Sequence, residues 1–325
     1  MAEEPAALDA LDRKVLHALQ LDGRASFTHI ADVLGVSDQT VARRFRQLRT
    51  TAKLRVLGVT NTQRIGPGNW IVRLTCLPGA TGQLVDTLAR RCDTWHVELL
   101  SGGTEAMCGV RPRSDRERDE LLLDRLQRTP QLTSVQAYSV LHNYFSGPSG
   151  WLTKIRALDP DQEAALRPPL EQTTTAIALD GADESILAAL RHDGRISSLE
   201  LQARTNLSAD AVARRLNRLR ASGVLYFDVQ YNPECLGHIV AAMLWLTVAP
   251  SALDQIGRTL ARHPQVRYAA ATTGRTNLIA TTVHRTNDDL YRYVAHDIGA
   301  LTGVASTEVT PIQRVVKDLD YPAGR

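Results

Sequence analysis

Two stretches of the chain carry hydrophobic residues at helical spacing, and each is followed by a stretch of strand-forming residues. In residues 8–50 an apolar residue recurs every three or four positions, which predicts amphipathic helices packed around one core. Ser26 is suited to cap a second helix and Ser37 a third, with Gly35 supplying a left-handed turn between them. Three short helices with a tight turn before the third predict a helix-turn-helix.

The third predicted helix has one apolar face and one basic face. Winding it at about 100° per residue puts Val41, Phe45 and Leu48 on the buried side. Between residues 37 and 55, six basic residues stand against one acidic residue, a net charge of +5. Exposed arginines can pair with guanine edges in the major groove and with phosphates. The residues predicted to contact DNA are Ser37, Gln39, Thr40, Arg43, Arg44, Arg46 and Gln47.

The same pattern returns in the second half of the chain. The stretch "VARRFRQLR" begins at Val41 and "VARRLNRLR" at Val212, and the tripeptide Asp-Gly-Arg occurs at residues 22–24 and again at 193–195. A register kept over so long a distance indicates a tandem duplication. In residues 208–224, four basic residues against one acidic residue give a net charge of +3, weaker than in copy one. The predicted DNA contacts of copy two are Ser208, Asp210, Arg214, Arg215, Asn217 and Arg218.

Each helix-turn-helix is followed by a segment in which strand and helix patterns alternate. In copy two the apolar run "IVAAMLWLTV" is typical of a strand, and the following elements give the order βαββαβ. The predicted elements of copy two are 239–248, 251–263, 266–273, 278–283, 288–298 and 304–315, and those of copy one are 70–77, 83–91, 95–101, 106–110, 116–126 and 132–141. This order is that of a ferredoxin-like unit, whose sheet has helices on one face and leaves the other to a partner.

The predicted fold class is therefore α+β, with two winged-helix-like helix-turn-helix domains and two ferredoxin-like βαββαβ domains. The predicted domains are 1–62 and 63–145 for copy one, and 179–233 and 234–325 for copy two. Between them, residues 146–178 are predicted to be a linker, since Pro, Gly and Thr dominate both of its ends. The two ferredoxin-like units can supply each other's partner face within one chain.

Bulk composition narrows the function less than the local charge does. The whole chain has a net charge of +3 and 43% hydrophobic residues, as in an ordinary folded protein. The four cysteines and nine histidines are scattered, so we expect no metal site, no cofactor and no catalytic group of residues. The sequence has no signal-peptide pattern and no apolar run near 18 residues, which predicts a cytoplasmic protein without a membrane segment.

Both copies resemble the Lrp/AsnC family of transcription regulators. The resemblance rests on "LDALDRKVLHAL", "DGRASFTHIADVLGVS" and "VARRFRQLR" in copy one, and on "DESILAALRHDGRIS" and "VARRLNRLRASGVL" in copy two. It implies double-stranded DNA as a partner, a βαββαβ effector and assembly domain (the RAM domain) after each helix-turn-helix, and assembly into homo-oligomers. One chain would then be a pseudo-dimer with two unequal recognition helices.

The resemblance also implies a small-molecule, amino-acid-like effector bound where RAM domains meet, near a Gly-x-x-Asp motif. The matching positions here are Gly102, Gly103, Thr104 and Glu105 in copy one, and Gly274, Arg275, Thr276 and Asn277 in copy two. Neither copy has the aspartate, because Glu105 keeps the charge on a longer side chain and Asn277 loses it. The alternative is that both tetrapeptides are hairpin turns that need glycine.

Two other functions fit the same domain plan. Siroheme decarboxylases are similar in domain plan and use paired AsnC-like subunits, and an architectural DNA-binding protein would share the basic helix. An enzyme of that kind would not need a basic outer face on its third helix, and here that face is basic. The sequence therefore favours a DNA-binding regulator over the enzyme, and nothing in it separates a regulator from an architectural protein.

Overall fold

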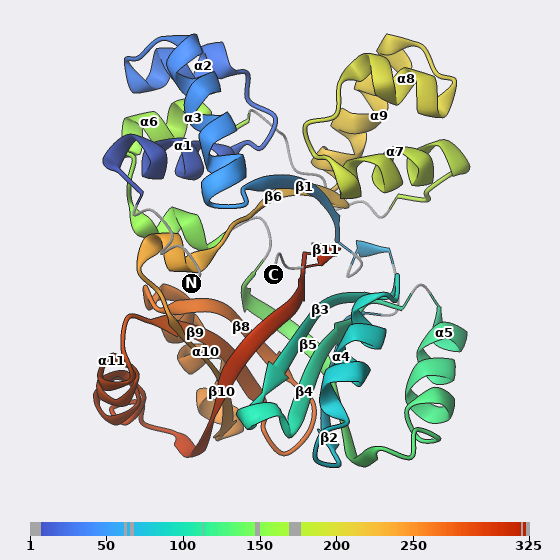
Figure 1. Cartoon of the computed structure of the whole chain (residues 1–325), viewed down its shortest axis with the longest axis vertical. Helices are drawn as coiled ribbons and strands as arrows, with labels where there is room; N and C mark the ends of the chain where they lie inside the picture. The colour runs from blue at the N-terminus through green and yellow to red at the C-terminus, as the bar shows by residue number, and fades with distance from the viewer. Residues whose placement is uncertain are drawn as a thin grey trace. The chain divides into compact units, whose positions relative to one another are not determined.

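The computed structural model describes residues 8–61, 64–65, 68–112, 114–146, 150–168, 177–319 and 321–322. Parts of the predicted linker, residues 147–149 and 169–176, lie outside the described residues. The chain divides into two compact units, residues 1–65 with 147–236 and residues 66–146 with 237–325. Each unit therefore combines one module from each copy: the two helix-turn-helix modules share one unit, and the two βαββαβ modules share the other (Figure 1).

The helix-turn-helix unit contains three helices from each copy, with boundaries set by local caps. They are α1 (Ala10–Leu21), α2 (Phe27–Leu34) and α3 (Asp38–Thr51) in copy one, and α7 (Gly181–His192), α8 (Ser198–Thr205) and α9 (Ala209–Ala221) in copy two. Gly35 ends α2 with a φ of 67°, and Asn206 ends α8 with a φ of 53°. Both copies make the same left-handed turn, with glycine in one and asparagine in the other, as predicted from sequence.

The strand after each helix-turn-helix pairs with its counterpart from the other copy. β1 (Arg55–Thr60) and β6 (Leu225–Gln230) form a two-stranded antiparallel ribbon. The first helices are exchanged across this ribbon, since α1 of copy one packs on β6 and α7 of copy two packs on β1. A Cβ added to Gly58 of β1 would lie 2.6 Å from the Cβ of Leu190 on α7, so this close approach requires glycine. The two helix-turn-helix modules thus share one core.

Each βαββαβ module has the predicted order of elements. In copy one they are β2 (Trp70–Cys76), α4 (Thr81–Ala89), β3 (Thr94–Leu100), β4 (Glu105–Val110), α5 (Asp115–Asp119) and β5 (Leu132–Phe145). In copy two they are β7 (Val240–Val248), α10 (Leu253–Arg262), β8 (Val266–Thr272), β9 (Leu278–His284), α11 (Asn287–Arg292) and β10 (Val304–Asp318). The helices α5 and α11 each continue as a π-helical turn, over Glu120–Arg125 and Tyr293–Ile298. The predicted α+β fold class with two ferredoxin-like units is confirmed.

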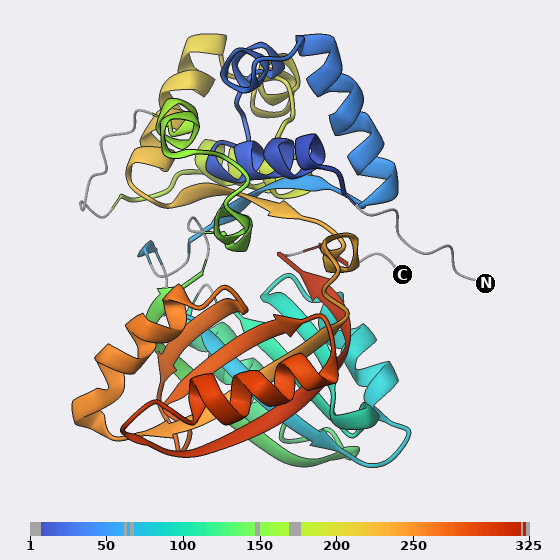
Figure 2. The same ribbon diagram turned by 90° about the vertical axis from the view of Figure 1, so that its left-hand side faces the viewer.

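The two modules close into one antiparallel barrel. The strands follow the order β10-β3-β4-β2-β5-β8-β9-β7, and β10 pairs with β7 as well as with β3, which closes the ring. The short strand β11 (Tyr321–Pro322) pairs with the end of β10. In Figure 2 the helices of this unit lie outside the barrel.

The last strand of each module is longer than the sequence predicts. β5 pairs with β2 of its own module as far as Ser139, and from Val140 to Phe145 it pairs with β8 of the other copy. β10 pairs with β7 as far as Pro311 and then with β3. The predicted ends, at residues 141 and 315, fall short because the extra residues find their partners in the other copy.

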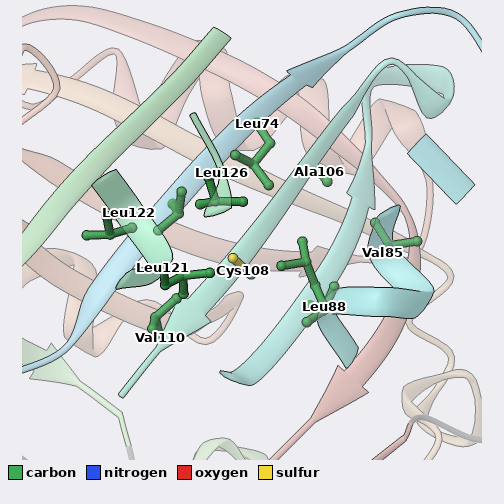
Figure 3. Close-up of a cluster of buried hydrophobic side chains, with 11 residues drawn as sticks. Leu74, Val85, Leu88, Ala106, Cys108, Val110, Leu121, Leu122 and Leu126 are labelled. Carbon is green, nitrogen blue, oxygen red and sulfur yellow. The ribbon is translucent and has the colours of Figure 1, made fainter. Parts of the chain in front are cut away.

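The barrel has an apolar interior and a separate apolar layer beneath its helices. Buried interior side chains come from both copies: Ile71, Leu100, Met107, Tyr138, Val140, Met243, Trp245, Ala270 and Ile279. On the outer side of copy one, Val85 and Leu88 of α4 pack with Cys108 of β4 and with Leu121 (Figure 3). The sheet of copy one is therefore covered by its own helices on one face and meets the sheet of copy two on the other.

Part of the predicted linker packs on the helix-turn-helix unit. A 3-10 turn (Trp151–Ile155) and α6 (Pro160–Leu166) lie in residues 150–168, which we call the strap. The backbone N–H of Leu158 in the strap donates to Nδ1 of His17 on α1 (3.3 Å), and Nε2 of Gln162 donates to a carbonyl at the end of α2 (3.2 Å). The strap therefore belongs to the core of copy one, which its Pro-rich and Thr-rich flanks did not indicate.

Candidate nucleic-acid interface and effector loops

The helix α3 is fixed by its cap and by buried anchors. The Ser37 hydroxyl accepts a hydrogen bond from the Thr40 backbone N–H (3.1 Å) and lies 2.8 Å from the Thr40 hydroxyl. Val41 and Leu48 are buried against the rest of the module. These contacts leave one face of α3 in solvent, and the predicted DNA contacts exposed on it are Gln39, Arg43, Arg46 and Gln47.

Three arginines of α3 are exposed and make no ion pair with another described residue: Arg43, Arg46 and Arg49. Nε of Arg46 lies 3.3 Å from the Ala42 carbonyl of its own helix, so this guanidinium stays along the helix surface. Apart from this one hydrogen bond, the three guanidinium groups keep their donors for phosphates or for guanine edges. The outer face of α3 is thus available to a polyanion.

Arg44 does not belong to that face. Its Nη1 lies 2.6 Å from Asp9 and 3.2 Å from Asp12, at the start of α1, and its side chain is 20% exposed. Hydrogen bonds from the Asp12 backbone and from Arg44 lower the pKa of Asp9, so the pair stays charged near neutral pH. Arg44 joins the third helix to the first, and its inclusion among the DNA contacts is corrected.

The equivalent arginine of copy two has the same role. Arg215 lies 2.8 Å from both Asp180 and Asp183, which form the capping box of α7. Arg218 pairs with the buried carboxylate of Asp183, although its side chain stays 45% exposed. Both arginines are therefore engaged inside the module, and Arg215 is removed from the predicted DNA contacts for the same reason as Arg44.

The outer face of α9 is consequently poorer in available charge than that of α3. Ser208 caps the helix through the Ala211 backbone N–H (3.3 Å). The predicted contacts Asp210, Arg214 and Asn217 are exposed. With Arg220 paired to Asp22 (3.1 Å), Arg214 is the one arginine of α9 without an ion-pair partner among the described residues. The two recognition helices thus differ more than their sequence charges suggest.

The first effector tetrapeptide forms the turn between β3 and β4. Gly102 and Gly103 have φ values of 65° and 90°, and the Thr104 hydroxyl donates to the Ser101 carbonyl (2.8 Å). Both backbone positions favour glycine, which supports the reading of this tetrapeptide as a turn. Its last residue, Glu105, is the first residue of β4.

Glu105 is already bound by an arginine inside the barrel unit. Arg73 of β2 donates to both carboxylate oxygens of Glu105 (2.9 and 3.1 Å) and also to Glu308 of copy two. The same guanidinium stacks 4.8 Å from the ring of Trp245, again from copy two. The hydrogen bond with Glu308 raises the pKa of Arg73, and the same hydrogen bond lowers the pKa of Glu308. One arginine therefore links the carboxylates of both copies.

The second tetrapeptide is also a turn, between β8 and β9. Gly274 has a φ of 103°, and the carbonyls of Arg275 and Thr276 accept hydrogen bonds from neighbouring threonine hydroxyls (3.1 and 3.0 Å). The Asn277 amide makes two 2.8 Å hydrogen bonds with the backbone of Val248. In copy two the side chain at the position of the family aspartate thus holds the end of β7.

A buried charged cluster that sequence reasoning missed joins β3 to the end of β10. The His96 ring lies 2.7 Å from Glu98 through Nε2 and 3.1 Å from Asp318 through Nδ1, and Glu98 is 1% exposed. Burial opposes the charged ring, but Glu98 and Asp318 outweigh it and raise the pKa of His96 to about 10. The scattered histidines of the sequence gave no sign of this cluster, because Asp318 comes from the other copy.

We expect His96→Gln to destabilise the protein by about 3–5 kcal/mol at pH 6, because it leaves Glu98 buried without its charged partner. Since the folded-state pKa is raised, the protonated ring gives its full stabilisation below the ordinary pKa near 6.5 and loses it as pH rises toward about 10. Urea unfolding of both proteins between pH 6 and pH 10 should show a difference that narrows with pH. The exposed His296→Gln is the control, and a difference that is constant with pH would contradict the prediction.

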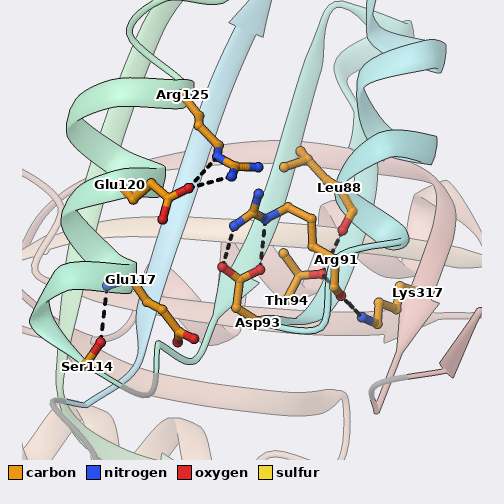
Figure 4. A network of polar contacts seen from close by, with 9 residues as sticks. All are labelled: Leu88, Arg91, Asp93, Thr94, Ser114, Glu117, Glu120, Arg125 and Lys317. Carbon is orange, nitrogen blue, oxygen red and sulfur yellow. Dashed lines mark hydrogen bonds and ion pairs between the residues drawn. The ribbon is translucent and has the colours of Figure 1, made fainter.

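A second polar contact also joins β10 of copy two to copy one. Nζ of the buried Lys317 donates to the Arg91 carbonyl (2.7 Å), just after α4, and lies 3.3 Å from the Thr94 hydroxyl (Figure 4). The Arg91 side chain forms a two-bond pair with Asp93 (2.8 and 2.6 Å). A cation at the C-terminal end of a helix is favoured by the helix dipole, so Lys317 anchors β10 to α4.

Two further properties follow from the described residues. Within them, no group of three or more His, Cys, Asp or Glu side chains is placed to hold a metal ion. Nor does any of the helices they form have both the length and the apolar character for crossing a membrane.

Three family models match the chain. An AsnC-type helix-turn-helix domain matches residues 8–49, a winged helix-turn-helix DNA-binding model matches 179–226, and the Lrp/AsnC ligand binding domain matches 241–321. An uncharacterized HTH-type transcriptional regulator of Pyrococcus abyssi is 30% identical over 142 residues, which are 43% of this chain and 90% of that protein. The chain belongs to the Lrp/AsnC family. That relative is matched over most of its length by less than half of the chain. The two helix-turn-helix matches, together with the two βαββαβ modules of the structure, show that this Lrp/AsnC protein contains the domain plan twice.

Two other comparisons complete the description of this Lrp/AsnC protein. The HTH-type transcriptional regulator LrpA of Mycobacterium tuberculosis is 32% identical over 104 residues, which are 31% of this chain and 69% of that protein. Among solved structures, the siroheme decarboxylase NirDL superposes with a TM-score of 0.66 over 98% of this chain and 95% of its own, at 14% identity. At that identity the likeness concerns the fold alone, and it extends to the duplicated layout.

Proposed function

We propose that this Lrp/AsnC protein is a sequence-specific transcription regulator that binds double-stranded DNA as a single-chain pseudo-dimer. The observation that carries the proposal is the outer face of α3, where Arg43, Arg46 and Arg49 are exposed and make no ion pair with another described residue. A capped helix that follows a left-handed turn and presents guanidinium groups suits the major groove. The names of its relatives, which are transcriptional regulators, point in the same direction.

The contacts that we propose are narrower than the sequence suggested. For α3 they are Gln39, Arg43, Arg46 and Gln47, with the cap formed by Ser37 and Thr40 at the helix N-terminus facing phosphate. For α9 they are Asp210, Arg214, Asn217 and the half-exposed Arg218, with Ser208 at the cap. The two helices then form unequal contacts, which suits an asymmetric operator.

We place the effector site, by the same reasoning, at Arg73 and its two carboxylate partners. An amino-acid-like ligand carries both charges of this cluster: its carboxylate could replace Glu308 at Arg73, and its ammonium group could pair with Glu105. Such a ligand competes with contacts that the protein already makes, so binding there would act on the link between the two copies. Further association of these pseudo-dimers into homo-oligomers, and a cytoplasmic location beside the chromosome, belong to the same proposal.

Siroheme decarboxylation and purely architectural DNA binding are the alternatives to this proposal. The resemblance to NirDL is one of fold, and an enzyme of that class has no use for the unpaired arginines on α3. We therefore infer that the chain acts through DNA without catalysing a reaction. A regulator is distinguished from an architectural protein by preference for a particular sequence, so a selected DNA site with a reproducible consensus would separate them.

We expect DNA binding to fall steeply with salt. If the protein contacts about four to six phosphates, raising the salt from roughly 50 to 200 mM should lower its affinity on the order of 10²- to 10³-fold, because binding releases counterions. Gel-shift or fluorescence titrations on a selected site measure this slope. The double variant Arg43→Ala/Arg46→Ala should show a shallower slope than the parent. Equal affinity at both salt concentrations, no binding at either, or a haem-like absorption spectrum in the purified protein would favour the enzyme instead.

A further inference from the structure

The repeated Asp-Gly-Arg tripeptide forms a reciprocal contact between the two helix-turn-helix modules. Arg24 of copy one donates from Nη1 to the carbonyls of Gly194 (2.8 Å) and Ile196 (3.1 Å) in copy two. Arg195 of copy two donates to the carbonyls of Gly23 (2.6 Å) and Ala25 (2.9 Å) in copy one. Each guanidinium thus binds the turn that carries the other, and we call these two arginines the clasp.

The other two residues of the tripeptide shape the turn for this contact. The Asp22 carboxylate accepts from the Arg24 backbone N–H (3.0 Å), and Asp193 does the same for Arg195 (2.8 Å). A Cβ added to Gly23 would lie 2.6 Å from the side chain of Val56 on β1, so the turn needs glycine. The tripeptide is therefore a turn that fits against the ribbon and aims its arginine across it.

The clasp is connected directly to both recognition helices. The Arg195 guanidinium lies 4.7 Å from the ring of Phe27 and 5.5 Å from that of Phe45, which belongs to α3. On the other side, Arg220 near the end of α9 pairs with Asp22 of the copy-one turn (3.1 Å). Changing a clasp arginine is therefore expected to alter contacts of both α3 and α9.

We propose that Arg24 and Arg195 are positioning residues that fix the separation and rotation of α3 relative to α9, and with them the operator spacing that the chain accepts. The ribbon and the exchanged first helices also join the two modules, but two-stranded ribbons vary widely in twist, so the four hydrogen bonds of the clasp select one twist. Two half-sites must present their grooves on the same side of the duplex to be bound together. This inference rests on the proposed DNA binding, but the fixed geometry can be measured without DNA.

The first test measures the distance between the two recognition helices in the full chain. Nitroxide labels are placed at Gln39→Cys and Asp210→Cys, in a background where the exposed Cys92 is Ser and the three buried cysteines are kept. We compare Arg24→Lys/Arg195→Lys with the parent and with Arg13→Ala, an exposed arginine of α1. Lysine keeps the charge but loses the fork of donors. The distance distribution of the double variant should widen at least about twofold, because lysine cannot donate to two carbonyls of the facing turn at once in the fixed geometry of the guanidinium.

If the double variant does not fold, Arg24→Lys alone preserves the Arg195 half of the clasp and is measured in its place. Circular dichroism establishes which variant keeps the native helix content. An unchanged distance distribution in the folded variant would overturn the proposal. The Arg13→Ala control must give the same distance distribution as the parent. Only then is the widening assigned to loss of the clasp.

The second test uses DNA selected by the parent protein and the same DNA with about five base pairs inserted between its half-sites. The insertion turns one half-site to the opposite side of the duplex, so the parent should lose roughly tenfold or more in affinity. The Lys/Lys variant should bind the two DNAs within about threefold of each other. If its distances widen but its spacing preference equals that of the parent, the spacing role is overturned. If no protein binds DNA, the proposed function fails and the distance measurement alone decides whether the clasp fixes the helices.

Discussion

Residues 1–145 expressed alone are expected to aggregate or self-associate, with no stable monomer. In the intact chain β1 is paired along its length with β6, and the edge strands β3 and β5 of the copy-one sheet are paired with β10 and β8. Removing copy two leaves all three strands with unpaired backbone groups, which are templates for pairing with another chain. The fragment also lacks the strap, whose residues pack on α1 and α2.

The apolar interior of the barrel makes the effect large. Without copy two, side chains such as Ile71, Met107 and Tyr138 lose the sheet that buries them, at about 1.5–3 kcal/mol for each large side chain. Light scattering after size exclusion should show dimers or aggregates of the fragment. The full chain is the control for a properly closed barrel. A monodisperse, folded monomer of residues 1–145 would show that pairing between the copies is not needed.

The two copies are also complementary, so a mixture should behave differently from either fragment. Arg73 of copy one and Trp245 of copy two occupy equivalent positions in their sheets. Arg73 pairs with Met107 and Gln136, and Trp245 pairs with Ile279 and Glu308. Two copies of copy one would bring two Arg73 guanidiniums together without Glu308. In the intact chain the single Arg73 has the Trp245 ring and the Glu308 carboxylate beside it instead. Mixing residues 1–145 with residues 179–325 should therefore favour the one-to-one complex.

The local part of the fold could be predicted from sequence, because helix caps, turns and periodicity are local. Ser37, Gly35 and Asn206 lie where the sequence placed the cap and the two left-handed turns. The order βαββαβ was predicted on the same basis. The ends of β5 and β10 could not be, because their last residues pair with strands that lie far away in the sequence. The short helix α6 could be expected from residues 159–167, but the packing of the strap could not, because its partners lie on α1 and α2.

The candidate interface shows the same division. Helical winding alone separated Arg43 and Arg46 from the buried Val41 and Leu48, and the structure agrees. Winding could not show that Arg44 is bound to α1. Its partners, Asp9 and Asp12, lie at the N-terminus of α1, far from Arg44 in the sequence. The same is true of the arginines of α9. The net charge of a segment includes every arginine equally. The structure shows which of these arginines are already paired with an acidic residue and are less available to DNA.

The two recognition helices therefore differ strongly in the number of arginines without an acidic partner. α3 keeps Arg43, Arg46 and Arg49 without ion pairs among the described residues, while α9 keeps only Arg214 and carries Asp210 on the same face. The exposed carboxylate of Asp210 can accept from cytosine but is repelled by neighbouring phosphates. The position of Arg46 in α3 is occupied by Asn217 in α9, which suits adenine and adds no charge. We therefore expect α3 to supply most of the affinity for DNA.

Arg43→Ala should consequently weaken binding more than Arg214→Ala. Loss of a bidentate contact to guanine costs about 1–3 kcal/mol, roughly 5- to 150-fold in Kd, and at Arg214 we expect a loss toward the lower end of that range. Both variants are titrated on one site selected by the parent protein and at one salt concentration, because both affinities depend on salt. Arg13→Ala, on the exposed side of α1, is the control for a lost surface charge. Each variant should also relax the base preference at a different half-site, since each helix contacts its own. If Arg214→Ala proves the more damaging change, α9 is the principal recognition helix. The number of arginines without an acidic partner then does not predict which helix contributes more to the affinity.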